Sequence, residues 1–93
     1  MIHRELISRQ LDLFAEDGGD LLSDVADLRA RYNGAARDEA EEAYGDYAYA
    51  VETAKDALAQ MRDAFASTLE DPEEYERAFE AAARKRWRWL DDG

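Results

Sequence analysis

The 93-residue sequence contains no cysteine, one proline and one histidine. Without cysteine, a disulfide framework, a thiolate metal site and a cysteine nucleophile are all excluded. No apolar stretch approaches the length of a membrane span, and charged residues interrupt the first fourteen positions, which excludes the apolar core of a signal peptide. We therefore expect a cytoplasmic protein with no membrane partner, or one exported by a route that leaves no cleaved signal.

Residues for catalysis are also scarce. The only histidine, His3, falls in the first turn of the first predicted helix, where we interpret it as a solvated surface residue. No Glu-x-x-His pair is present, so the ligands of a di-metal carboxylate bundle are missing. The hydroxyl side chains have no histidine or lysine near them that the sequence identifies. We expect no enzymatic activity, no cofactor and no metal.

Acidic residues, by contrast, are abundant. The chain has 23 acidic and 12 basic residues, which gives a formal net charge of -11. Such a chain repels nucleic acid and anionic lipid and is attracted to basic protein surfaces. Only Lys55 and Lys85 are lysines; a preference for arginine together with many Ala and Asp is also typical of a GC-rich or salt-adapted genome, so the acidity has two open explanations.

Two apolar runs with alternating steps of four and three residues lie on either side of Asn33-Gly34. Their members are Ile7, Leu11, Phe14, Gly18, Leu21, Val25, Leu28 and Tyr32 in the first run, and Ala40, Tyr44, Tyr47, Val51, Ala54, Leu58, Met61 and Phe65 in the second. A mean spacing of 3.5 keeps one seam of a helix facing a partner helix. The pattern predicts an all-α fold: a long antiparallel, coiled-coil-like helical hairpin within a single domain, 1–93.

The predicted boundaries are a helix over 2–31, a turn over 32–35, a helix over 36–69 and a third helix over 72–90 that packs on the hairpin. We expect the first helix to continue through Gly18-Gly19, because the heptad register is the same on both sides; the alternative is a break there, capped by Asp17 or Asp20. Gly34 is expected to end that helix in the left-handed conformation. Asp71 as N-cap, Pro72 at the first helical position and Glu74 three residues after the cap mark the start of the third helix.

A turn at Asn33-Gly34 also sets the register between the two long helices. The expected pairs are Leu11 with Leu58, Phe14 with Ala54, Gly18 with Val51, Leu21 with Tyr47, and Val25 with Tyr44. In this register Gly18 provides room for Val51 and Tyr47. Beside the seam, alanine recurs every seven residues at Ala36, Ala43, Ala50, Ala57 and Ala64, and we expect the third helix or a second copy to cover this stripe.

The carboxylates are organised into a pattern on the first predicted helix. Asp17, Asp20, Asp24 and Asp27 step by three and four residues, so they share one face. Like charges at this spacing destabilise a helix, and four of them over roughly 15 Å approach the charge density of a nucleic-acid strand. We predict that they bind a partner, together with further residues of the second helix and its start: Asp38, Glu42, Asp46 and Tyr49.

The C-terminal region has the opposite sign, with Arg84, Lys85, Arg86 and Arg88 around Trp87 and Trp89. Cations and tryptophans together can stack on bases or lie on a membrane. The negative charge of the rest of the chain repels both ligands. We therefore expect an internal role, in which a tryptophan closes the open end of the hairpin and the arginines meet its carboxylates.

Two kinds of resemblance bear on function. The hairpin resembles the small secreted WXG-type hairpins in length, but its turn is Tyr32-Asn33-Gly34 without tryptophan, and Phe79 stands where the export signal of that family needs an acid after Tyr75. In size, charge and lack of catalytic residues the chain resembles phage anti-CRISPR proteins and acidic antitoxins. We therefore expect a non-catalytic protein that binds a basic, nucleic-acid-binding surface of a partner, as an inhibitor or DNA mimic, without binding nucleic acid itself. The alternative is a self-assembling hairpin, a homodimer with a structural or secretion-type role.

Overall fold

The computed structural model describes residues 3–91 and is all-helical in that range, as predicted, with no strand. The predicted helix start at Ile2 lies outside the described residues. The helices are α1 (Arg4–Asp17), α2 (Gly19–Asn33), α3 (Ala40–Ala66), α4 (Pro72–Arg86) and the short 3-10 helix η1 (Arg88–Asp91).

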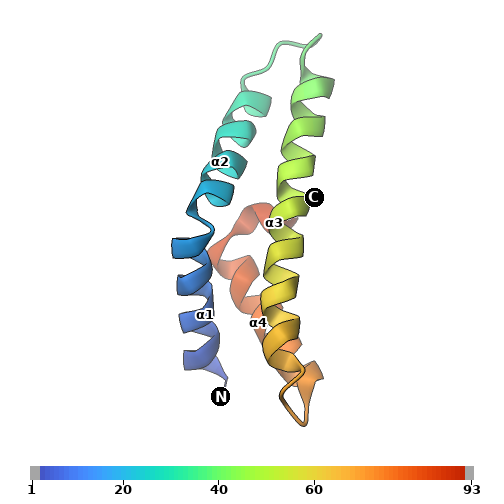
Figure 1. The fold of residues 1–93 in the computed structure, drawn as a ribbon. Helices are drawn as coiled ribbons and strands as arrows, with labels where there is room; N and C mark the ends of the chain where they lie inside the picture. Colours follow the sequence, from blue (N-terminus) through green and yellow to red (C-terminus); the bar gives the residue numbers. More distant parts are fainter. Residues whose placement is uncertain (1–2, 92–93) are drawn as a thin grey trace.

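The helices form an elongated body of 51 × 22 × 19 Å in which α1 and α2 follow one another along one side of α3 (Figure 1). Helix α4 packs against α1 and α3, while α2 packs against α3. We call α1, α4 and residues 55–66 of α3 the three-helix end, and α2, the connection 34–39 and residues 40–54 of α3 the two-helix arm. The described chain ends near the middle of the body, where η1 contacts both α3 and α4.

The first predicted helix is divided at Gly18, so the expectation of a continuous helix over 2–31 was wrong. The amide of Gly18 donates to the Phe14 carbonyl at 2.7 Å, which draws the backbone of Gly18 close to that oxygen. A Cβ at Gly18 would lie 2.9 Å from the Phe14 carbonyl oxygen, and neither Val51 nor Tyr47 is among its nearest neighbours. The absence of a side chain at Gly18 therefore makes room for the carbonyl of Phe14 in the preceding turn, and not for side chains of α3.

The connection between α2 and α3 is longer than the predicted turn. Gly34 follows the end of α2 but has φ of -99°, so it does not take the left-handed conformation. A further turn, closed by the Glu39 amide donating to the Ala36 carbonyl at 2.9 Å, precedes α3. Helix α3 therefore begins at Ala40 and not at residue 36.

This longer connection shifts α3 along α2 relative to the predicted register. Arg31 pairs with Asp46 at 2.8 Å, whereas the predicted register places it opposite residue 37. Val25 is fully buried in a cluster with Val51, and its expected partner Tyr44 is 45% exposed. The period of the two runs thus identified helical faces, but the length of the connection determined which residues meet.

Helix α3 ends three residues before the predicted boundary. The hydroxyl groups of Ser67 and Thr68 donate to the carbonyls three residues earlier, at 3.0 and 2.7 Å. Such local bonds compete with the helical ladder and favour a helix end. Asp71 and Pro72 begin α4 as predicted, although the Asp71 side chain forms no capping hydrogen bond.

Helix α4 ends at Arg86, four residues before the predicted boundary, because Trp87 takes an extended conformation. The Trp87 ring packs edge-on against Phe14 with centroids 5.5 Å apart. Trp89 then packs on the arm cluster and Leu90 on the cluster of the three-helix end. These contacts replace a last helical turn, and they place the tryptophans at the middle of the molecule, not at the open end of the hairpin.

The core consists of two clusters that match the two regions. The first joins α1, α3 and α4, and the second joins α2 and α3. Their buried members are Ile7, Leu11, Phe14, Leu58, Ala66, Tyr75, Phe79 and Ala83 in the three-helix end, and Val25, Tyr47, Ala50, Val51 and Ala54 in the arm.

The alanine stripe is covered only in its middle. Ala43 and Ala50 are buried, and Ala57 is half-buried against the cluster of the three-helix end. Ala36 and Ala64 are exposed. The alanines are therefore covered only where other helices of the same chain pack against α3.

Candidate functional site

All residues of the predicted partner-binding set are exposed in the structure. Asp17 ends α1, three of the set lie on α2, one lies in the connection and three lie on α3. The set comprises Asp17, Asp20, Asp24, Asp27, Asp38, Glu42, Asp46 and Tyr49.

The break at Gly18 changes how the aspartates relate to the helix dipoles. Asp20 lies in the first turn of α2, where the partial positive charge of a helix N-terminus stabilises a carboxylate. Asp17 lies at the C-terminal end of α1, where the dipole opposes a negative charge. Asp24 and Asp27 lie in the interior of α2 at spacing i, i+3, where like charges repel. The local helix therefore stabilises Asp20, but it does not stabilise the other three.

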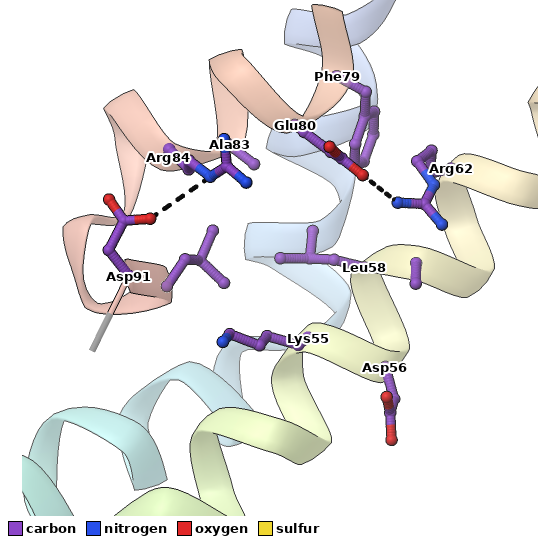
Figure 2. A pocket seen from close by; sticks show the side chains of 11 residues that line it. Lys55, Asp56, Leu58, Arg62, Phe79, Glu80, Ala83, Arg84 and Asp91 are labelled. Atoms are coloured by element: carbon purple, nitrogen blue, oxygen red, sulfur yellow. Dashed lines mark hydrogen bonds and ion pairs between the residues drawn. The ribbon is translucent and has the colours of Figure 1, made fainter. Parts of the chain in front are cut away.

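Ion pairs are concentrated away from these aspartates. In the three-helix end Arg86 pairs with Asp12 at 2.8 Å, and Arg62 pairs with Glu80 at 2.5 Å, a pair that Figure 2 shows between α3 and α4. In the arm Arg31 pairs with Asp46 at 2.8 Å, and both side chains are about half exposed. The predicted contact of C-terminal arginines with carboxylates is thus present, and it involves none of Asp17, Asp20, Asp24 and Asp27, which we call the aspartate stripe.

The arm has an excess of negative charge. Between residues 19 and 54 nine carboxylates accompany three arginines. All nine carboxylates belong to exposed residues. Since exposed like charges reinforce one another within a Debye length of about 8 Å at physiological salt, the arm presents a negative potential to any approaching protein.

An aromatic group on the arm was not predicted. The Tyr32 ring stacks on that of Tyr47 with centroids 6.2 Å apart and contacts that of Tyr44 at 5.3 Å. Tyr49 lies outside this group and is 77% exposed, more than either of the other exposed large apolar residues. The sequence spacing identified Tyr49 as lying away from the seam, but it assigned Tyr44 to the seam in the wrong register.

The perturbed titratable groups lie in the three-helix end. The hydrogen bond to Asp63 and the negative charges of Asp63 and Glu80 raise the pKa of Arg62 against the opposing effect of burial. Burial raises the pKa of Tyr75, whose hydroxyl donates to the Gln10 side chain. Both arrangements stabilise packing between helices.

His3 differs from the interpretation of a solvated residue. Its side chain is half-buried, and its ring packs edge-on against Tyr75 at 5.5 Å. Within residues 3–91 no group of three His, Asp or Glu side chains is arranged to hold a metal ion. None of the helices in that range has the length and apolar character needed to cross a bilayer.

Comparison of this chain with models of known protein families, with curated proteins and with solved structures found no match. The exposed acidic surface of Asp17 and the arm is therefore the feature that bears on function.

Proposed function

We propose that this chain is a non-catalytic, acidic helical protein that binds a basic, nucleic-acid-binding surface of a partner protein. The observation that supports the proposal is the group of Asp17, Asp20, Asp24 and Asp27, which are exposed and take no part in the ion pairs of residues 3–91. A partner with a basic groove would provide the counter-charges that the chain itself does not provide.

The spacing of these carboxylates suits a surface that otherwise binds nucleic acid. Three charges at Asp20, Asp24 and Asp27 extend over about 10 Å of helix, one per roughly 5 Å, which approaches the one charge per roughly 3.4 Å of a DNA strand. A long antiparallel, coiled-coil-like hairpin would hold them in a line. Arginine and lysine side chains that contact phosphates would then find carboxylates at similar intervals.

The partner class follows from this chemistry. A small acidic helical protein that occupies a nucleic-acid groove acts as an inhibitor or nucleic-acid mimic, in the manner of phage anti-CRISPR proteins, or as an acidic antitoxin. We place this function in the cytoplasm, where such partners and their nucleic acids are found. The chain's own charge of -11 opposes direct binding to nucleic acid.

Self-assembly is the second candidate, and the exposure of Tyr49 favours it, since exposed tyrosine is enriched at interfaces. A homodimer through α3 would bring Asp46 and Glu52 of two copies together with Tyr49. The repulsion between these carboxylates opposes such an interface. A basic partner would neutralise the same carboxylates. Heteromeric binding is therefore the stronger proposal.

The test begins with capture of partners from cells of the source organism on the immobilised chain, followed by purification of each captured protein. Binding is then measured by calorimetry with the parent and with a variant in which Asp17, Asp20, Asp24 and Asp27 are changed to Asn. A matched control changes four exposed acids outside this group, Glu16, Glu70, Glu73 and Glu74, to Gln, which removes the same charge.

We expect the Asp variant to bind at least about tenfold more weakly than the parent, the Glu control to lose much less, and duplex DNA or RNA to compete with the parent for the partner. Equal loss in both variants would mean that net charge alone drives association. Unchanged binding of the Asp variant would refute the proposal, and a dimer that dissociates on Tyr49→Ala would then support self-assembly.

A further inference from the structure

A cleft of about 460 Å³ lies between α3, α4 and η1 in the three-helix end, away from the aspartate stripe. Its volume is within the range of small-molecule sites in proteins. Five apolar residues line it, namely Leu58, Ala59, Phe79, Ala83 and Leu90. Charged side chains from all three elements also line the cleft (Figure 2).

Most charged groups of the cleft neutralise one another. Arg62 pairs with Glu80 at 2.5 Å, and Arg84 pairs with Asp91 at 3.4 Å. The dashed lines in Figure 2 mark these two pairs, one on the α3 side and one at η1. Glu80 and Asp91, the two acids that face the cations of the cleft, are therefore both engaged in ion pairs.

Lys55 is the exception. It forms no ion pair within residues 3–91, and its half-buried side chain points from α3 into the space below η1, whereas the neighbouring Asp56 points away from the cleft (Figure 2). An ammonium group beside apolar side chains, without a counter-ion, attracts an anion that carries an apolar body.

We propose that this cleft binds a small apolar carboxylate, with the carboxylate on the ammonium of Lys55 and the apolar body against Leu58 and Leu90. The Arg84 guanidinium adds attraction for the carboxylate at the η1 side, because its ion pair with Asp91 is long. The side chains of Arg84 and Asp91 are 59% and 66% exposed. Of the acids of residues 3–91 that line the cleft, only Asp56 lies outside these ion pairs, and its carboxylate points away from the cleft (Figure 2), so a cationic ligand gains less than an anionic one. A neutral ligand gains only the apolar contact.

The net charge of the protein makes binding of an anion diagnostic. At -11 the surface as a whole repels a carboxylate and attracts an ammonium. Binding of an anionic amphiphile at one saturable site therefore reflects the local arrangement at Lys55, and not a general attraction to the surface.

The experiment uses the full chain and three probes with the same tail: octanoate, octanol and octylammonium. Two-dimensional NMR titration identifies the residues that respond and gives the dissociation constants. Lys55→Met removes the charge and keeps the length of the side chain. Lys85→Met is the matched control, because it removes the only other lysine, which is exposed on α4 and does not line the cleft.

We expect octanoate to saturate one site and to shift signals of Leu58, Phe79 and Leu90. Lys55→Met should weaken octanoate about fivefold to tenfold and leave octanol unchanged, while Lys85→Met leaves both unchanged. Ala59→Leu, which fills the cleft at a half-buried position, should weaken both octanoate and octanol.

Three results would overturn the proposal. One is the absence of a saturable octanoate response below about 10 mM. Another is an equal effect of Lys55→Met and Lys85→Met on octanoate, and the third is tighter binding of octylammonium than of octanoate at the cleft residues. Circular dichroism of each variant verifies that the helices are retained.

Discussion

The three-helix end and the two-helix arm differ in the size of their buried side chains. Phe14, Leu58, Tyr75 and Phe79 fill the core of the end, whereas the arm is closed by small residues such as Val25 and Val51 around Tyr47. Larger side chains remove more apolar surface from water and contribute more to stability. The comparison indicates that the end holds the fold together and that the arm extends from it.

The two regions also differ in the extent to which their charged side chains form ion pairs. The end pairs Arg62, Arg84 and Arg86 with acids from other parts of the chain, while the arm leaves most of its carboxylates facing solvent. Because these exposed carboxylates contribute little to the stability of the fold, a partner can bind them without disrupting interactions that hold the protein together. This separation is the basis of the proposed function.

The largest expected effect is the loss of a core aromatic from the end. Phe79→Ala should lower the free energy of unfolding by about 3 to 5 kcal/mol, because it leaves a cavity among three helices. Val51→Ala in the arm removes only two carbons and should cost about 2 kcal/mol. Urea unfolding monitored by circular dichroism measures both. Equal losses would mean that the arm carries as much of the stability as the end.

Trp89 is the contact through which the C-terminal segment reaches the arm cluster. Trp89→Ala should cost about 1 to 2 kcal/mol, since the ring is only half-buried. Amide hydrogen exchange should accelerate in α2 and remain slow in α1. The exposed neighbour Arg88→Ala is the control and should change neither rate. Uniform acceleration over both helices would show that the two regions unfold as one unit.

The helix break between the regions is tested by two adjacent glycines. Gly18→Ala forces the new Cβ away from the Phe14 carbonyl and should cost about 1 kcal/mol. A Cβ at Gly19 meets no atom within 4 Å, so Gly19→Ala should stabilise α2 by up to about 1 kcal/mol. Thermal unfolding distinguishes the two signs. Stabilisation by both substitutions would mean that a continuous helix is accessible at no cost.

The smallest effect concerns alkaline pH. Burial raises the pKa of Tyr75 in the folded state, so ionisation of this phenol in the unfolded chain favours unfolding once the pH exceeds the ordinary pKa of tyrosine, about 10. The stability from Tyr75 is therefore present at neutral pH and is lost as the pH rises above that value. Tyr75→Phe should lose stability less steeply over this range, and identical pH profiles would refute the assignment.

Much of the helical pattern was predictable from the sequence, because it depends on local signals. The 3.5-residue period identified the helical faces, and Asp71-Pro72 fixed the start of α4. The break at Gly18 was not predictable from the period, since the apolar phase continues across it and the cause is one close backbone approach to Phe14.

The register and the C-terminal turn depend on tertiary contacts that periodicity does not encode. The additional turn at Glu39 moves α3 relative to α2, and the packing of Trp87 on Phe14 ends α4 early. For the candidate surface, the sequence correctly placed the aspartates on the exterior. It did not reveal that Asp46 pairs with Arg31, and Asp20, a candidate cap for a break at Gly18, lies in the first turn of α2.

The central claim is that the aspartate stripe serves a partner and not the fold, and the most direct test measures both properties of one variant. We change Asp17, Asp20, Asp24 and Asp27 to Asn and determine the free energy of unfolding and the association rate with the captured partner across a range of salt. We expect stability equal to or slightly above that of the parent, together with slower association whose salt dependence is reduced. A variant that loses more than about 1 kcal/mol of stability while binding the partner as fast as the parent would contradict it.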